Sequence, residues 1–291
     1  MSAEAATPAR LSPLDRAGRA LGLSALIVGG FFPLVWMVLT SLKTEAELQK
    51  FPVQYLPGAL DAANYARVFS EQPFARFFFN SLTVSLLSTL LCIAVAVPAA
   101  YALARLQVWG RSVLLTAVVA FSMFPVVSLL VPLFRLFRGV DLLNSYPALI
   151  LPYAALSLPV AILTLVAFFS AIPRDLEAAA MIDGTSRVGA LWRVVLPLSA
   201  PGVVTAALLI FVNSWNEFLL ALSFNTKLDM RTVSVGVTLY QGEFAFPWPL
   251  IAAAVVIATI PVVALIAIFQ RRFVAGLTAG GEGVEIVKID S

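Results

Sequence analysis

The stretch of the chain from residue 172 to residue 184 is the part most informative about the fold, and it reads Ile172-Pro173-Arg174-Asp175-Leu176-Glu177-Ala178-Ala179-Ala180-Met181-Ile182-Asp183-Gly184. Pro173 suits the first turn of a helix, where a backbone N–H is not needed. Asp175 and Glu177 are acids near the positive end of that helix, and the alanines are strong helix formers. Gly184 fits a left-handed stop. The stretch therefore predicts one short helix.

A second short helix is expected directly after the first. Ser186 can cap a helix that runs from Arg187 to Leu196, and Pro197 would end it. Together the two helices form a bend between two apolar runs. The small alanines of the first helix permit close approach by another protein, so we expect it to dock into a partner's cleft. The alternative is a helix resting on lipid headgroups, which would need a basic polar face opposite large apolar residues.

On both sides of this bend the sequence is strongly apolar. The 291 residues are 60% hydrophobic and 12% charged, and the mean hydropathy is +0.95. Soluble domains are nearer half apolar and a quarter charged, so the solvent of this chain must be largely lipid. A spanning helix needs about 20 apolar residues. Runs of that length predict an all-α integral membrane protein with six transmembrane helices, at about 20–42, 81–104, 112–134, 146–170, 199–222 and 249–270.

Positive charges indicate the orientation. Arginines cluster around Arg105–Arg111 and Arg271–Arg272, which favours cytoplasmic N- and C-termini. A short surface helix is expected near Asp61–Phe69, outside the membrane. The predicted divisions are a cytoplasmic N-terminal segment at 1–19, a transmembrane part at 20–272 with the cytoplasmic bend at 171–197, and a cytoplasmic tail at 273–291.

Several kinds of chemistry are disfavoured by composition. The chain has no histidine, which is the commonest metal ligand and general base. Its one cysteine, Cys92, lies within an apolar run and is interpreted as a small buried hydrophobe. No lysine follows a glycine, so the usual phosphate-binding loop is missing from the sequence. We expect no catalysis, no metal and no cofactor on this chain.

The fifth apolar run carries a polar cluster. Glu217 is the acid predicted at membrane depth, where charges are expensive and usually functional. Helical spacing would place Asn213, Asn216 and Glu217 on one face, beside Trp215. An aromatic ring beside amides and a carboxylate suits a sugar, so these four residues are candidates for a substrate pathway or gate. The alternatives are hydrogen bonds that join neighbouring helices and a position of Glu217 near the outer interface.

The combination of Glu177-Ala178-Ala179, Asp183-Gly184 and Leu196-Pro197 resembles the "EAA" loop in transmembrane subunits of bacterial ABC importers. The resemblance extends over most of the chain and is closest to the carbohydrate-uptake branch, in particular the second permease of maltose-type and trehalose-type systems. Its further segments are Asn64-Tyr65, Asn80-Ser81, Trp215-Asn216-Glu217-Phe218 and Phe269-Gln270-Arg271-Arg272-Phe273 with Gly276-Leu277-Thr278.

This resemblance implies a function and a set of partners. The chain would lie in the bacterial plasma membrane, form half of a sugar-import pore with a second, homologous permease, and receive sugar from an extracytoplasmic binding protein. Two separate ATP-binding subunits would hold ATP and Mg, and no nucleic acid would be involved. The residues that couple the pore to the ATPase would be Glu177, Ala178, Ala179, Asp183 and Gly184, with the glutamate contacting the ATPase and the glycine permitting the bend.

Two other functions remain open from the residues alone. A secondary transporter driven by an ion gradient would want several intramembrane charges and internal repeats. A membrane-embedded transferase would want clustered carboxylates at one interface to hold a metal. One predicted intramembrane glutamate and acids scattered through the loops count against both.

Overall fold

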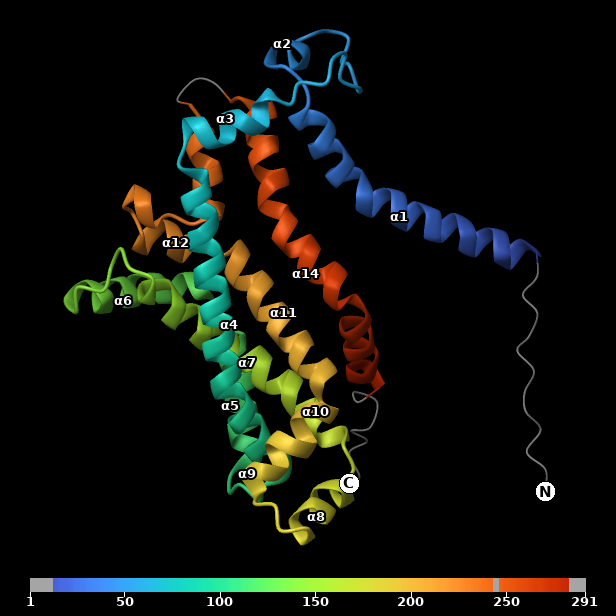
Figure 1. Cartoon of the computed structure of the whole chain (residues 1–291), viewed down its shortest axis with the longest axis vertical. Coiled ribbons are helices and arrows are strands. Elements are labelled where there is room, and N and C mark those ends of the chain that lie inside the picture. The colour runs from blue at the N-terminus through green and yellow to red at the C-terminus, as the bar shows by residue number, and fades with distance from the viewer. Residues whose placement is uncertain (1–12, 243–245, 283–291) are drawn as a thin grey trace. The chain divides into compact units, whose positions relative to one another are not determined.

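The structure is a computed structural model, and it describes residues 13–242 and 246–282. All regular elements in these two ranges are helical, which confirms the all-α prediction (Figure 1). The chain divides into two compact units. Unit 1 is Met1–Val68 with Gln241–Ile257, and unit 2 is Phe69–Tyr240 with Ala258–Ser291.

Four helical segments are long and apolar enough to cross a membrane. They are Leu21–Ser41 within α1 (Pro13–Ser41), α4 (Phe74–Arg105), α7 (Pro147–Ala171) and Trp248–Gln270 within α14 (Trp248–Glu282). Two bent pairs of helices raise the number to six if each pair is one span. Each of the six predicted runs overlaps one of these helices or bent pairs, although the fifth run extends beyond its pair.

In unit 1 the backbone that follows α1 is held by the Asn64-Tyr65 pair. This unit also contains α2 (Glu45–Leu48) and most of α3 (Ala63–Glu71), the latter close to the short helix predicted at Asp61–Phe69. The Asn64 amide donates to the carbonyl oxygens of Ser41 and Lys43, both at 3.0 Å. The Tyr65 hydroxyl lies 2.7 Å from the Ser41 hydroxyl. These contacts give the two polar residues a structural role at the end of α1.

The core of unit 2 is formed by three helices that pack against one another, α4, α7 and α11 (Ala200–Asn216) (Figure 1). Many of the buried residues are small, and small residues let membrane helices approach closely. Cys92 is a free, buried member of this core, as the sequence predicted. Other members are Ala96, Ala100, Ala161, Leu165, Phe169, Val195, Ala206 and Ile210.

The third predicted span is not one continuous helix. Residues 112–134 fall on α5 (Arg111–Ser122) and α6 (Val126–Gly139), which meet at 90°. Pro125 stands immediately before α6. A proline has no N–H to donate and pushes the preceding residue out of the helical region, so the helix breaks there.

The fifth predicted span is also interrupted. Helix α11 ends at Asn216, Glu217 is extended with φ −66° and ψ 131°, and α12 (Leu219–Phe224) follows. The prediction of one helix over 199–222 is therefore wrong. The next short elements are η2 (Leu228–Met230), α13 (Val233–Gly236) and η3 (Val237–Tyr240).

The Asn80-Ser81 pair near the start of α4 holds this short-element segment in unit 2. The Asn80 amide donates to the carbonyl oxygens of Asp229 at 2.9 Å and Arg231 at 2.8 Å. The Ser81 hydroxyl accepts from the N–H of Val233 at 2.8 Å. The predicted divisions at 1–19, 20–272 and 273–291 stay predictions, and parts of the outer two lie outside the described residues.

Candidate functional site

The predicted bend lies between α7 and α11 and contains four short elements. They are α8 (Arg174–Ile182), α9 (Arg187–Ala190), the π-helix η1 (Leu191–Val195) and α10 (Leu196–Leu198). In Figure 1 they gather at one end of the α4, α7 and α11 core of unit 2. Gly184 has φ +89°, which confirms the left-handed stop. The Ser186 hydroxyl accepts from the N–H of Gly189 at 3.1 Å and confirms the predicted cap.

The second short helix does not end before Pro197. The chain continues through η1 into α10, and Pro197 lies in the first turn of α10, where a missing N–H costs little. The turn ends at Ser199, and the segment Arg187–Leu198 then meets α11 at 80°. π-Helices are rare and occur mostly as single turns inside α-helices, often at functional sites.

Glu177 is turned toward its own chain. It is only 8% exposed and is the one buried residue of α8. The hydroxyl of Tyr101, on α4, donates a hydrogen bond to its carboxylate. Nε of Arg105, one turn further along α4, lies 3.6 Å from Oε2 of the same carboxylate. The resemblance implies that this glutamate contacts an ATPase subunit, whereas the structure places it against α4.

The same two α4 residues also contact the backbone on either side of α8. Nη2 of Arg105 donates to the carbonyl oxygen of Ile172, where α7 ends, at 2.7 Å. The Tyr101 hydroxyl lies 3.4 Å from the carbonyl oxygen of Arg187, where α9 begins. We call the segment from α9 to α10 the second arm of the bend. The C-terminal end of α4 therefore contacts the entry of the bend, α8 and the start of this second arm.

The other predicted coupling residues face outward. Ala178, Ala179, Asp183 and Gly184 are all exposed. Beside them, Ile182 is 86% exposed. A surface of small and apolar side chains with an acid at its edge is suited to docking into a complementary cleft, because it exposes few groups that need water.

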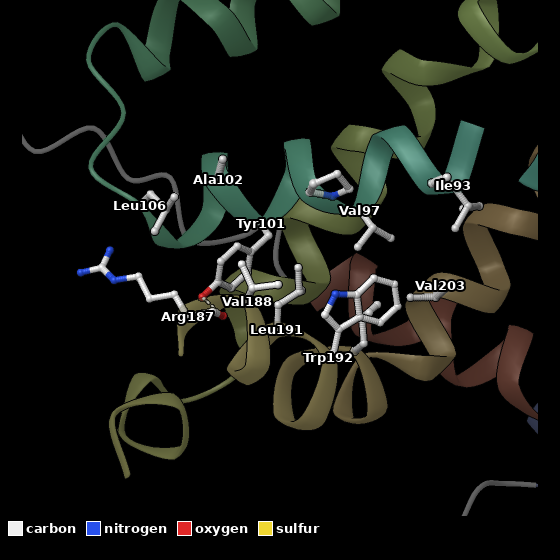
Figure 2. A pocket seen from close by; sticks show the side chains of 13 residues that line it. Ile93, Val97, Tyr101, Ala102, Leu106, Arg187, Val188, Leu191, Trp192 and Val203 are labelled. Atoms are coloured by element: carbon white, nitrogen blue, oxygen red, sulfur yellow. Dashed lines mark hydrogen bonds between the residues drawn. The ribbon is translucent and has the colours of Figure 1, made fainter. Parts of the chain in front are cut away.

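An apolar cavity of about 460 Å³ lies between α4 and the second arm of the bend (Figure 2). Ile93 and Val97 line it from α4, and Leu191 and Trp192 line it from η1. Figure 2 shows Tyr101 at the cavity, with the guanidinium of Arg187 directed away from it. With this lining, the cavity cannot hold a charged or strongly polar molecule at low cost.

In the second predicted cluster, Trp215 and Glu217 hydrogen-bond to other parts of the chain, whereas Asn213 and Asn216 are exposed. The Glu217 carboxylate accepts from the Tyr153 hydroxyl and from the N–H groups of Leu220 at 2.8 Å and Ala221 at 3.1 Å. Asn213 and Asn216 keep the expected spacing within α11, whereas Glu217 follows the last residue of that helix.

Trp215 is 4% exposed, and its Nε1 donates to the carbonyl oxygen of Ala258 at 3.1 Å. Asn213 and Asn216 are exposed, and the Asn216 amide donates to the Val212 carbonyl oxygen at 2.9 Å in its own helix. Asn213 lines a cavity of about 260 Å³ between α7 and α11, together with Ser157. Asn213 is therefore the residue of this cluster best placed to meet a solute.

Sequence reasoning missed three residues that complete these contacts, namely Tyr101, Arg105 and Tyr153. Tyr101 and Arg105 carry a signal, since they are polar groups four residues apart at the end of an apolar run. Tyr153 carries none, because its carboxylate partner is 64 residues away in the sequence. Within the described ranges, no group of three or more Cys, Asp or Glu side chains could hold a metal ion.

Comparison with known proteins is consistent with this geometry. Residues 65–278 match the family model "Binding-protein-dependent transport system inner membrane component". The chain is 59% identical over 263 residues to the sulfoquinovosyl glycerol transport system permease protein SmoH of Agrobacterium fabrum, covering 90% of this chain and 92% of that protein. It is 40% identical over 261 residues to the trehalose transport system permease protein SugB of Mycobacterium tuberculosis, covering 89% and 94%.

A solved structure has the same fold. It is the crystal structure of a bacterial ABC transporter involved in the import of the acidic polysaccharide alginate, with a TM-score of 0.75 and 21% identity over 92% of this chain and all of that one. The architecture is thus that of a type I ABC importer permease, and the predicted resemblance is confirmed. This chain belongs to the family of binding-protein-dependent transport system inner membrane components, and it is a multi-pass transport subunit rather than an enzyme.

Proposed function

We propose that this chain is one of two permease subunits of an ATP-driven sugar importer and forms half of its pore. A second, homologous permease supplies the other half, two ATP-binding subunits hold ATP and Mg, and an extracytoplasmic binding protein delivers the sugar. The substrate is a di- or oligosaccharide or another small glycoside. Sulfoquinovosyl glycerol is the first candidate, because the relative named for its transport is 59% identical to this chain.

The observation that carries this proposal is the arrangement of α8. Its one buried residue, Glu177, fastens it to α4, and its other face presents Ala178, Ala179 and Asp183 outward. An ATPase subunit docked on that face has a firm point of attachment to the core of unit 2. We propose that Glu177, Ala178, Ala179, Asp183 and Gly184 together couple the ATPase to the pore.

The topology follows from placing this bend in the cytoplasm. The N- and C-termini are then cytoplasmic, the predicted division is 1–19, 20–272 and 273–291, and the membrane is the bacterial plasma membrane. Arg105, Arg174 and Arg187 lie at the end of the unit 2 core where α8 is found. They support this placement, since positive residues are enriched on the cytoplasmic side.

The polar cluster at the end of α11 borders the sugar pathway in this proposal. The exposed amides of Asn213 and Asn216 are the groups available to sugar hydroxyls. Trp215 and Glu217 act indirectly, because their polar atoms already bond to Ala258 and Tyr153 and hold the end of α11 in place. The cavity that Asn213 shares with Ser157 supports a pathway along the α7–α11 face.

The test is transport by the complete importer in proteoliposomes with ATP trapped inside. Labelled sulfoquinovosyl glycerol, trehalose and maltose are supplied outside with the binding protein. We expect uptake of one of these sugars, dependent on ATP and on the ATPase subunits. Uptake that persists without the ATPase subunits and follows an ion gradient would instead support the secondary transporter.

A further inference from the structure

The attachment of α8 to the rest of unit 2 is narrow. Among the residues that the structure describes, α8 packs mainly on α9 and η1 within the same bend, and Glu177 is its one buried side chain. The groups that surround the Glu177 carboxylate are Tyr101 and Arg105, both in the last turn of α4. Force applied to α8 therefore has a direct polar route into a spanning helix.

Arg105 and Tyr101 extend this route to both arms of the bend. Arg105 is almost completely buried, with 3% of its side chain exposed, and it also donates to the Ile172 carbonyl oxygen. Tyr101 lies within 3.4 Å of the Arg187 carbonyl oxygen. The end of α7, α8 and the start of α9 are thus all held by two side chains of one helix turn.

The Tyr101, Arg105 and Glu177 cluster is the most rigid part of the contact between α4 and the bend. Along the stretch from Ile93 to Tyr101, the second arm of the bend faces α4 across the apolar cavity of Figure 2 and joins the same apolar core through Leu191 and Val195. Apolar contacts are not directional and tolerate sliding. A buried carboxylate, by contrast, cannot leave its donors without a large desolvation cost, and its charge-assisted hydrogen bonds fix geometry as well as distance.

From this we infer that Tyr101 and Arg105 are positioning residues of the transport cycle, which hold Glu177 so that α4 moves together with α8 when the ATPase subunits close. The inference rests on the proposed function and adds a specific route to it. Closure of the ATPase subunits then moves α4 through its contacts with α8, and not only α7, which leads directly into the bend. Neither residue needs to touch sugar or ATP for this role.

The experiment measures the amount of sugar imported per ATP hydrolysed by the complete importer in proteoliposomes. The variants are Tyr101→Phe, which removes only the hydroxyl, and Arg105→Gln. We expect both to assemble with the ATPase subunits and to hydrolyse ATP, while the ratio falls about tenfold or more, as expected from losing one hydrogen bond to a charged group. The matched control is Arg111→Gln, an exposed arginine at the start of α5 that should keep the wild-type ratio.

Two further variants separate coupling from simple stability. If Tyr101 acts through Glu177, the double variant Tyr101→Phe/Glu177→Gln should lower the ratio no further than the stronger single variant does. In a Cys92→Ala background, cysteines at positions 101 and 177 should give a low ratio that a short bifunctional thiol cross-linker raises again, since the cross-link replaces the lost contact.

The inference is overturned if Tyr101→Phe and Arg105→Gln keep the wild-type ratio. It is equally overturned if hydrolysis and uptake fall in proportion, or if the cross-link stops the remaining transport, because α8 and α4 would then have to move apart. Wild-type protein is measured alongside. Lack of ATP-dependent uptake by the wild type would defeat the proposed function itself, whereas active wild type with unchanged variants would defeat this inference alone.

Discussion

The hydroxyl of Tyr153, in the second turn of α7, donates a hydrogen bond to the carboxylate of Glu217, at the point where α11 ends. The same carboxylate accepts the N–H groups of Leu220 and Ala221, which lie in the first turn of α12. One acidic side chain therefore joins two helices and supplies the first turn of a third with acceptors. A break in a membrane helix needs such replacement partners for its freed backbone groups.

Replacing Glu217 with alanine leaves these three donors without an acceptor. Each unsatisfied buried donor costs about 1–3 kcal/mol, so we expect Glu217→Ala to lower the free energy of unfolding by roughly 3 kcal/mol or more. Glu217→Gln keeps one carbonyl oxygen and should lose about 1 kcal/mol. Thermal unfolding in detergent measures both. Unchanged stability of Glu217→Ala with an altered KM for sugar would show that Glu217 binds substrate instead.

Asn80 gives a second stability prediction. Its buried amide donates to two carbonyl oxygens, and its Oδ1 accepts from the Tyr146 hydroxyl at 2.8 Å. We expect Asn80→Ala to destabilise the protein by about 2–4 kcal/mol, because three polar groups lose their partner. The matched control is Asn216→Ala, an exposed asparagine whose substitution should stay within about 0.5 kcal/mol. Equal effects of the two substitutions would contradict this account.

Gly202 allows α11 to lie close to α7. A Cβ atom at this position would come within 2.2 Å of Cγ of Phe168. That atom is near the root of the ring, so it cannot swing aside freely, and we expect Gly202→Ala to cost about 1–3 kcal/mol. Adding Phe168→Leu should recover part of the loss. Gly139→Ala, where nothing lies within 4 Å, is the control and should be tolerated.

Gly184 is expected to tolerate side chains according to their backbone preference. Its φ of +89° disfavours L-residues, while nothing lies within 4 Å of the position that a Cβ atom would take, so only the backbone opposes substitution. We expect transport to be impaired least by Gly184→Asn, more by Gly184→Ala and most by Gly184→Val. For alanine, the left-handed backbone conformation costs about 1–2 kcal/mol of conformational free energy. ATP-dependent uptake and co-purification of the ATPase subunits measure the series. An order set by side-chain size instead would point to a steric contact with the partner.

Local signals in the sequence predicted the bend well. The helix at 174–182, the left-handed Gly184 and the Ser186 cap depend on residues within a few positions of each other, and all three are found. The break at Pro125 also had a visible cause in the sequence, although prolines elsewhere in the spans, such as Pro159, lie within continuous helix. A proline alone therefore does not say whether a membrane helix will break.

Contacts between distant residues could not be predicted. The break at Glu217 has neither proline nor glycine beside it and depends on a hydroxyl from α7. The burial of Glu177 depends on Tyr101, 76 residues earlier, so the sequence motif could indicate a coupling helix but not which way its glutamate points. The buried faces of the membrane helices could not be predicted either. Lipid and the protein interior are both apolar, so these helices lack a polar stripe that would mark one face.

The most direct test of the central claim is cross-linking from the exposed face of α8 to the ATPase subunit. In a Cys92→Ala background, a thiol-reactive photo-cross-linker is attached to Ile182→Cys and, as control, to Val113→Cys, an exposed position on α5 that is 72% exposed. We predict an adduct with the ATPase subunit from position 182 and none from position 113, with ATP-driven uptake lost as the adduct forms. A transport-competent importer that gives no adduct from position 182 would contradict the assignment of α8 as the coupling helix.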